Sequence, residues 1–218
     1  MVSFSNDADI LKYEPILFGE LHLPWQVLTE GSGGILNGTT FTVSGADFIT
    51  AQVSSGGVIY LESEDKSLDG VYEIVSVDSE TQLCVSVIRT DSQSEAIAPP
   101  SAENISYRVS TLAIQANEIG FQLTEYFGIR PGSPASDYSV EDILDITVLR
   151  QASVFGVITN VYAMLACKTK DDNFWSRSMY YRKLYNQAKA RARLSIDTGA
   201  DGIVDVTQIG ASGRLVRD

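Results

Sequence analysis

The chain has 218 residues, of which 44% are hydrophobic and 20% are charged, and its formal net charge at pH 7 is −12. This composition is typical of folded globular proteins and excludes fibrous and wholly disordered classes. The charge is uneven, because residues 1–110 hold 16 acidic and 4 basic residues, whereas residues 111–218 hold 12 of each. The acidic half would repel phosphates, which argues against nucleic acid as its partner.

The cysteines and the N-terminus give simple expectations about the compartment. Cys84 and Cys167 belong to no Cys-x-x-Cys pair, so we interpret them as buried free thiols in a reducing compartment. The first ten residues lack the basic and apolar regions of a signal peptide, and none is predicted. The longest uncharged apolar segment, residues 151–167, is shorter than a membrane-spanning helix needs and contains polar side chains. No membrane span is predicted.

The N-terminal 29 residues predict a short helix followed by irregular chain. Residues 5–7 offer polar capping side chains and an acid for the first helical turn, and Pro15 ends the helix. Residues 16–25 are apolar but broken by Gly19 and Pro24, so we expect an irregular segment there.

Residues 30–110 have the pattern of a small antiparallel β domain. Gly31 to Gly34 are expected to form a flexible link, after which β-branched and aromatic runs alternate with turn residues. The link at residues 78–81 between two such runs predicts a hairpin. The expected strands are residues 39–43, 58–61, 70–77, 81–87 and 105–109. We predict a small barrel or sandwich.

Helical periodicity returns at Thr111 and predicts a helix ending at Gly128. After a loop at residues 130–138, apolar residues recur every three or four positions from Val140 to about Lys168, with Ser139 as a candidate cap. Such a helix would span roughly 40 Å. It carries no charge between Arg150 and Lys168. A helix apolar nearly all the way round must be covered nearly all the way round, which one small domain would struggle to do.

A basic, aromatic helix follows the polar link at residues 169–173, where Asp171, Asp172 or Asn173 is able to cap it. Residues 195–202 break this helix, and residues 203–209 predict a last strand. The predicted fold class is α+β: a helical bundle with an inserted small antiparallel β barrel or sandwich. The helical domain is discontinuous and comprises residues 1–29 and 111–218, and the inserted β domain comprises residues 30–110.

Side chains suited to catalysis or metal binding are few. The only histidine, His22, lies among packing residues in LeuHisLeuProTrp, so neither a nucleophilic triad nor a zinc site is expected. No phosphate-binding motif occurs, and residues 31–38 neither follow a strand nor open a helix. Residues 197–202 partly match a calcium loop, but Gly199 and Gln208 stand where ligands are needed, so we interpret them as a turn. We predict no catalytic residue, no cofactor and no metal.

The basic stretch at residues 168–193 holds eight Lys or Arg and two Asp, a net charge of +6. Three interpretations stay open. It is the solvated face of an amphipathic helix, or a nucleic-acid surface without a recognisable motif, or a face that packs against an acidic neighbour in a homo-oligomer.

Four segments of the C-terminal half resemble the C-terminal end of tailed-bacteriophage head–tail connector proteins, also called adaptor or head-completion proteins. They are AspAsnPheTrp (172–175), TyrTyrArgLysLeuTyr (180–185), AlaArgAlaArgLeuSerIleAsp (190–197) and GlyAlaAspGlyIleValAsp (199–205). Residues 9–17 resemble the short N-terminal helix of the same group. The likeness covers roughly residues 5–18 and 112–205 and leaves the β insertion outside. Gly199 stands where the family's turn usually carries another Asp, so no ion is carried over.

The resemblance implies a structural virion protein that forms a ring, commonly of twelve subunits, between the portal of the phage head and the tail. The implied partners are the portal and the tail or tail-terminator proteins. DNA would pass through the lumen without specific binding, and no membrane is involved. The implied location is the neck of the virion, assembled in the bacterial cytoplasm. The residues expected at subunit or partner interfaces are Val154, Val157, Val161, Arg177, Arg182, Lys189, Arg193, Ile203, Val204, Val206, Ile209, Arg214 and Arg217.

Two alternatives belong to other classes. In the first alternative, the chain is another virion or surface structural module whose β domain binds a protein or a carbohydrate. Glycan binding that is lost on deletion of residues 31–110 would favour this alternative. Or it is an enzyme, for which only Asp and Glu chemistry remains and no spacing singles out a pair. A screen without turnover would argue against that role.

Overall fold

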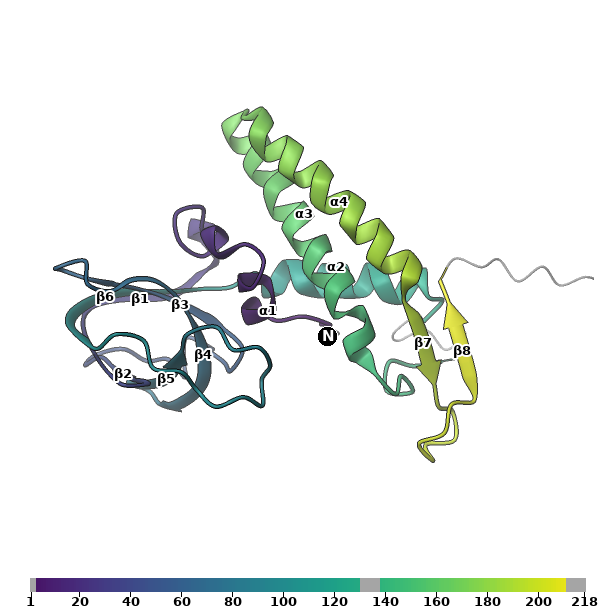
Figure 1. The fold of residues 1–218 in the computed structure, drawn as a ribbon, viewed down its shortest axis with the longest axis horizontal. Helices are drawn as coiled ribbons and strands as arrows, with labels where there is room; N and C mark the ends of the chain where they lie inside the picture. Colours follow the sequence, from purple (N-terminus) through teal and green to yellow (C-terminus); the bar gives the residue numbers. More distant parts are fainter. Residues whose placement is uncertain (1–2, 130–137, 211–218) are drawn as a thin grey trace, which may run out of the picture. The chain divides into compact units, whose positions relative to one another are not determined.

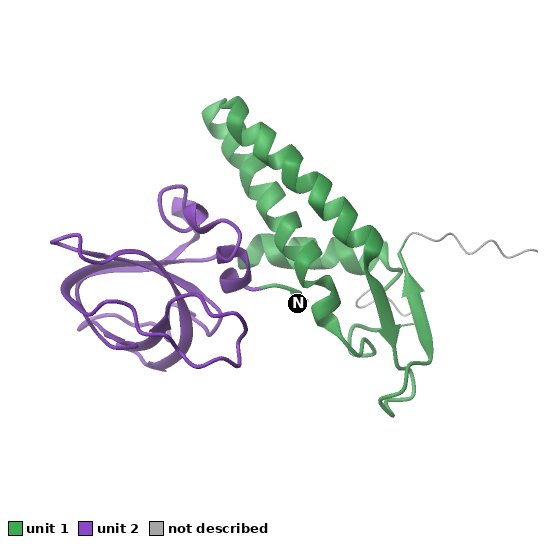
Figure 2. Cartoon of the chain, in the orientation of Figure 1, with its two compact units in different colours: residues 1–5, 113–218 green, residues 6–112 purple. Residues whose placement is uncertain are grey.

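The computed structural model describes residues 3–129 and 138–210 and has an α+β fold (Figure 1). The described residues contain a closed six-stranded antiparallel barrel and four α-helices. The chain divides into two compact units (Figure 2). We call residues 6–112 the barrel unit, and residues 1–5 with 113–218 the helical unit. Residues 6–29, which the sequence analysis grouped with the helices, fall in the barrel unit.

The barrel closes in the strand order β1-β2-β5-β4-β3-β6, with antiparallel neighbours throughout. Its strands are β1 (Val27–Asn37), β2 (Thr40–Thr42), β3 (Val58–Ser63), β4 (Asp69–Ser79), β5 (Gln82–Ser86) and β6 (Ala102–Ser110). The five predicted strands correspond to β2 through β6, and a barrel forms rather than a sandwich. The hairpin predicted at residues 78–81 is confirmed, because β4 ends at Ser79 and β5 begins at Gln82.

The glycine-rich link predicted at residues 31–34 is wrong, because these residues lie within β1. Aromatic rings explain the glycines. A Cβ on Gly31 would lie 2.9 Å from the Tyr107 ring, and one on Gly34 would lie 2.5 Å from the Phe41 ring. Phe41, Tyr107 and Phe48 form the aromatic centre of the barrel, with ring centroids 5.5 to 6.4 Å apart. The strand therefore lacks side chains where these rings need space.

The predicted N-terminal helix is α1 (Asp7–Leu11), and Asn6 caps it through a reciprocal pair of hydrogen bonds with Asp9. The irregular segment that follows contains two short 3-10 helices, Pro15–Leu17 and Pro24–Gln26. Both the capped start and the irregular segment match the sequence prediction.

Asp7 is a buried carboxyl group in the first turn of α1. Its Oδ1 accepts a hydrogen bond of 2.8 Å from the backbone N–H of Leu112. Burial raises the pKa of Asp7 from 3.8 to about 6, against the lowering effect of hydrogen bonds from Leu112 and Thr111. Because the folded state holds this proton more tightly than the unfolded state, stability falls as the pH rises from about 4 to 6. The loss is complete above that window.

Asp7→Asn is therefore expected to raise the free energy of unfolding by about 1 to 3 kcal/mol at neutral pH, since each unit of pKa is worth about 1.4 kcal/mol. The gain should vanish toward pH 4, where the buried Asp7 is already protonated. Urea denaturation at the two pH values measures it, with the exposed carboxyl variant Glu80→Gln as the control. Equal destabilisation of Asp7→Asn at both pH values would contradict the assignment.

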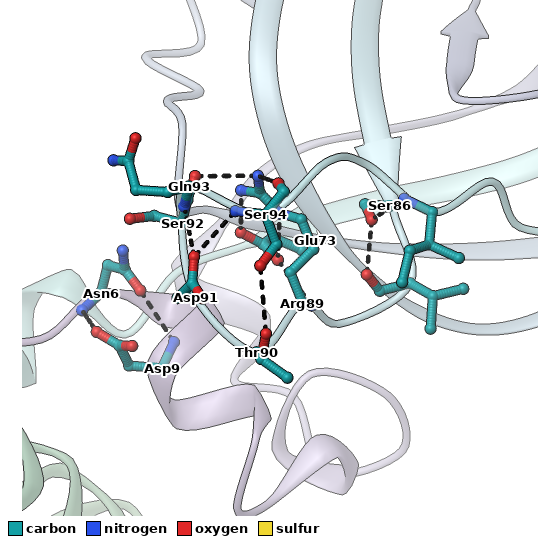
Figure 3. A network of polar contacts seen from close by, with 12 residues as sticks. Asn6, Asp9, Glu73, Ser86, Arg89, Thr90, Asp91, Ser92, Gln93 and Ser94 are labelled. Atoms are coloured by element: carbon teal, nitrogen blue, oxygen red, sulfur yellow. Dashed lines mark hydrogen bonds and ion pairs between the residues drawn. The ribbon is translucent and has the colours of Figure 1, made fainter.

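A buried ion pair fixes the loop after β5 to β4 (Figure 3). The Arg89 guanidinium donates to both carboxylate oxygens of Glu73, at 2.7 and 3.3 Å, and to the carbonyl oxygens of Ser92 and Ser94. The two side chains of the pair are 6% and 7% exposed. Asp91 accepts from the backbone N–H groups of residues 93 and 94 and so shapes the same loop.

The helical unit contains α2 (Ala113–Tyr126), α3 (Arg150–Thr169) and α4 (Asp172–Arg191). Figure 1 shows α3 and α4 side by side. As predicted, α2 ends before Gly128, which has a positive φ of 75°. Lys170, with φ of 55°, ends α3, and Asp171 caps α4 by accepting from the backbone N–H of Asn173.

The long apolar helix begins ten residues later than predicted, at Arg150 instead of Val140. Residues 142–144 are bound to a strand, β7 (Arg193–Ile196), and its end, through backbone hydrogen bonds and a bridge. The 3-10 helix Ile146–Leu149 then leads into α3, with Asp145 as its cap. Residues 142–144 therefore contact β7 and its end through their backbone instead of forming the first turns of the predicted helix.

β7 was not predicted, because it directly follows α4 and has little β pattern of its own. It pairs antiparallel with β8 (Val206–Ile209), which lies within the last strand predicted at residues 203–209. The two strands form a separate two-stranded sheet.

Candidate interaction surface on the helical unit

An open groove of 680 Å³ lies between α2, α3 and α4. The side of α4 that lines it carries Trp175, Met179, Arg182, Asn186 and Lys189. These residues follow each other at steps of four and three, so they share one face of the helix. We call this set the α4 outer face.

The adjacent side of α4 is held against α3 by aromatic stacking. The rings of Phe174 and Tyr181 lie 6.0 and 6.2 Å from the ring of Tyr162, with interplanar angles of 23° and 17°. Arg177 donates to the Tyr162 hydroxyl at 2.9 Å, and its guanidinium lies 5.5 Å from the centre of that ring. Arg177 therefore stabilises the helix pair.

Large apolar side chains remain on the solvent side of α4. Trp175 is 51% exposed, Met179 46% and Tyr180 60%. Tryptophan, tyrosine, methionine and arginine are the residues that interface cores favour over the rest of a protein surface. Their grouping on one helix marks a candidate protein-binding surface.

The cations of α4 and its C-terminal continuation have few acidic neighbours. In residues 3–129 and 138–210, no salt bridge joins a carboxylate to the set Arg182, Lys183, Lys189, Arg191 and Arg193. The ammonium group of Lys189 lies 4.5 and 4.7 Å from the ring centres of Tyr126 and Tyr185. Burial lowers the pKa of Lys189 and raises that of Tyr185. The other four cations are exposed.

The three valines predicted for an open interface are buried within the chain, which corrects that prediction. Val154 is 1% exposed, and Val157 and Val161 are fully covered. The neighbouring helices α2 and α4 both pack on α3, so little of its apolar surface remains open. Of the helix pair α3 and α4, α4 presents the large apolar side chains that are exposed.

The C-terminal hairpin carries the other predicted interface residues that the structure describes. Ile203, Val204 and Ile209 are 64%, 47% and 45% exposed, and Val206 is half-buried. β7 pairs with β8 and also carries the bridge to Ile143, so β8 is the outer strand of this sheet. Arg193 lies exposed at the start of β7. Arg214 and Arg217 lie outside the described residues.

Trp175 and Met179 of the α4 outer face were not predicted, because the mixed aromatic and basic pattern of this helix does not show which of its sides packs on α3. The side that packs on α3 carries Phe174 and Tyr181. The four-and-three spacing of residues 175, 179, 182, 186 and 189 was the available signal, since it places an aromatic, a thioether and two cations on one face.

The loop at residues 197–205 forms the turn that the sequence predicts, held by its own carboxylates. Asp197 accepts from the backbone N–H groups of Gly199, Asp201 and Gly202, and Asp205 accepts from Thr198. These hydrogen bonds hold the turn together from within. Across the described residues, no group of three or more His, Cys, Asp or Glu side chains is arranged to hold a metal ion.

His22 and the two cysteines are not among the residues that line the groove. His22 Nδ1 is 3.1 Å from the carbonyl oxygen of Gly19, within the irregular segment. Both cysteines are free, but Cys84 is half-buried and Cys167 is exposed, so the expectation of two buried thiols is wrong. The stretch Ile146–Thr169 is long and apolar enough to cross a membrane, a criterion that buried core helices also meet, and 61% of it is buried within the protein.

No protein-family model, no curated protein and no solved structure matches the chain. The candidate site is therefore defined by its own chemistry. It is an aromatic and cationic helix face beside a groove, together with a hairpin that exposes apolar side chains. This arrangement is suited to binding protein surfaces.

Proposed function

We propose that this chain is a structural subunit of a ring that joins the portal of a phage head to the tail and provides a channel for DNA, without catalysis. The observation that carries the proposal is the α4 outer face, where Trp175 and Met179 stay about half exposed beside Arg182. Covering this face with a neighbouring subunit would contribute about 25 cal/mol for each Å² of apolar area removed from water.

The region of resemblance to head–tail connectors supports the same role. Residues 172–205 comprise α4, β7 and the loop before β8, which are the elements that carry the exposed aromatic and basic side chains. In this proposal α2, α3 and α4 form the helical bundle that packs beside its neighbours in the ring. The hairpin, with Ile203, Val204 and Ile209 exposed, supplies a second surface for the portal or a tail protein.

The acidic N-terminal half supports a role in lining a channel through which DNA passes, and not a role in binding DNA. Residues 1–110 have a net charge of −12. Carboxylates along a lumen would repel the duplex and let it slide without sticking. A lumen surface that proved neutral or basic would remove this part of the proposal.

Electron microscopy of the purified chain mixed with the portal protein from the same genome tests the proposal. The expected image is a ring, commonly of twelve subunits, seated on the portal. The chain alone is expected to be monomeric at low concentration and to associate only weakly as its concentration rises. A monomer that ignores the portal at all concentrations would contradict the role.

A further inference from the structure

The α4 outer face and its flanking cations form a strongly basic surface that the helical unit leaves without carboxylate partners. Glu125 is the one carboxylate among the groove-lining residues, against Arg182 and Lys189. Lys183 lies beside them and is exposed. A cationic surface with half-exposed Trp175 at one end combines charge for orientation with apolar area for affinity.

One end of the barrel has the opposite character. It comprises the turn between β3 and β4 with the start of β6, and strand pairing places Ser63 opposite Ile105, so these segments are neighbours. Residues 62–69 and 102–104 contain five carboxylates and one cation, Lys66, a net charge of −4. We call this set the acidic barrel end; its carboxylates are Glu62, Glu64, Asp65, Asp69 and Glu103.

The acidic barrel end is shaped as well as charged. A hollow of 370 Å³ is lined there by Glu64, Asp65 and Glu103 together with short polar side chains. Asp65 is fixed by the hydroxyl groups of Ser63 and Ser67, at 2.6 and 2.7 Å, and these bonds lower its pKa to about 2. Lys66 pairs with Glu62, so Glu64 and Glu103 are left without a described cationic partner.

We infer that the acidic barrel end of one subunit binds the α4 outer face of a second copy of this chain. Each subunit carries one surface of each kind, on different units, so a contact between copies uses both once and runs head to tail. Such a heterologous contact closes into a ring when its rotation permits. The inference rests on the self-assembly in the proposed function and adds the two surfaces that make the contact.

A nucleic acid is the competing occupant of a basic helix face. The chain as a whole opposes it, because the net charge of −12 repels phosphates at long range. Two copies also repel each other at long range, but at contact distance the local charges decide, and there the basic face of one copy meets the acidic end of another. Charge complementarity within one sequence therefore favours a second copy.

Reciprocal charge reversal tests the contact by sedimentation velocity over a concentration series at low ionic strength. One variant carries Arg182→Glu and Lys183→Glu, and the other carries Glu64→Lys and Glu103→Lys. All four residues are exposed. Each variant alone is expected to lose self-association by at least about tenfold in Kd, which corresponds to about 1.4 kcal/mol. An equimolar mixture is expected to recover association, because each reversed surface then meets an opposite charge.

The matched control for the barrel-end variant is Asp78→Lys with Glu80→Lys, which changes the net charge as much as Glu64→Lys with Glu103→Lys does, at the other end of β4. It is expected to associate like the parent chain. About 1 M salt, where the Debye length is about 3 Å, should weaken parent association. If a reversal variant fails to fold by circular dichroism, the Gln variants at the same positions replace it, with a smaller loss expected.

Four results would overturn the inference: a parent chain that stays monomeric at every concentration, a mixture that does not recover, a control as weak as the reversal variants, or duplex DNA bound at physiological salt and lost with Arg182→Glu and Lys183→Glu. The proposed function is judged separately. If the reversal variants still form rings on the portal, the ring stands and this interface is wrong. If the parent associates as described but ignores the portal, the interface stands and the head–tail role fails.

Discussion

Arg89→Met is expected to lower the free energy of unfolding of the barrel unit by about 3 to 5 kcal/mol, the cost of breaking a buried ion pair from one side. The variant leaves the Glu73 carboxylate in a site where its side chain is only 7% exposed. It also removes the donors that bind the carbonyl oxygens of Ser92 and Ser94 and hold the loop against β4 (Figure 3). The backbone N–H of residue 89 would still donate to Glu73, at 3.3 Å, but one such bond does not compensate for the guanidinium.

Urea denaturation followed by Trp25 fluorescence measures this effect, in a Trp175→Phe background that leaves one tryptophan in the chain. Pairing Arg89→Met with Glu73→Leu should recover most of the loss, because it removes the stranded charge. Lys66→Met is the control, since it breaks an ion pair that is largely exposed and is expected to cost less than about 1 kcal/mol. If Arg89→Met lowers the free energy of unfolding no more than Lys66→Met does, the ion pair between Arg89 and Glu73 does not stabilise the barrel unit.

Gly156→Leu is expected to destabilise the helical unit by about 3 kcal/mol, at the upper end for overpacking a core. Gly156 lies in α3 and faces Ile119 of α2. A Cβ there would lie 2.8 Å from Cγ2 and 3.0 Å from Cδ1 of Ile119, which is 2% exposed. A leucine must therefore push α2 and α3 apart and disturb the floor of the groove, which both residues line.

Fluorescence of Trp175 in a Trp25→Phe background reports the unfolding of this unit. Gly156→Ala should cost less than the leucine variant, because alanine's higher helix propensity, worth about 1 kcal/mol, offsets part of the crowding. Adding Ile119→Ala to Gly156→Leu should restore part of the stability by vacating the space. The prediction is wrong if the Gly156→Leu variant has the same free energy of unfolding as the parent chain.

Most elements with strong local periodicity could be predicted from the sequence. The strands β2 to β6, the hairpin at residues 78–81 and the helices α2 and α4 follow from alternating or helical patterns and from turn residues. β1 could not be predicted from the sequence. Its glycines are needed because the Phe41 and Tyr107 rings leave no space for a side chain, and that contact is not local in sequence. The predicted start of α3 was ten residues too early. Residues 142–144 pair with β7 and its end through backbone hydrogen bonds, which do not depend on side-chain type and so cannot be read from the sequence.

The candidate surface was predicted in part. Arg182 and Lys189 were identified from the charge of their helix, and both line the groove. Val157 and Val161 were assigned to an open face because a helix that is apolar all round gives no sign of which side its own chain covers. The structure resolves this by packing α2 and α4 on α3, which leaves α4 to present Trp175.

Cryo-electron microscopy of the neck of the assembled phage particle tests the central claim most directly. The account predicts a ring between portal and tail in which each subunit shows a closed six-stranded barrel and the paired helices α3 and α4, with the α4 outer face covered by a neighbour. A neck whose density holds no such subunit, or a particle in which this chain lies elsewhere, would contradict the claim.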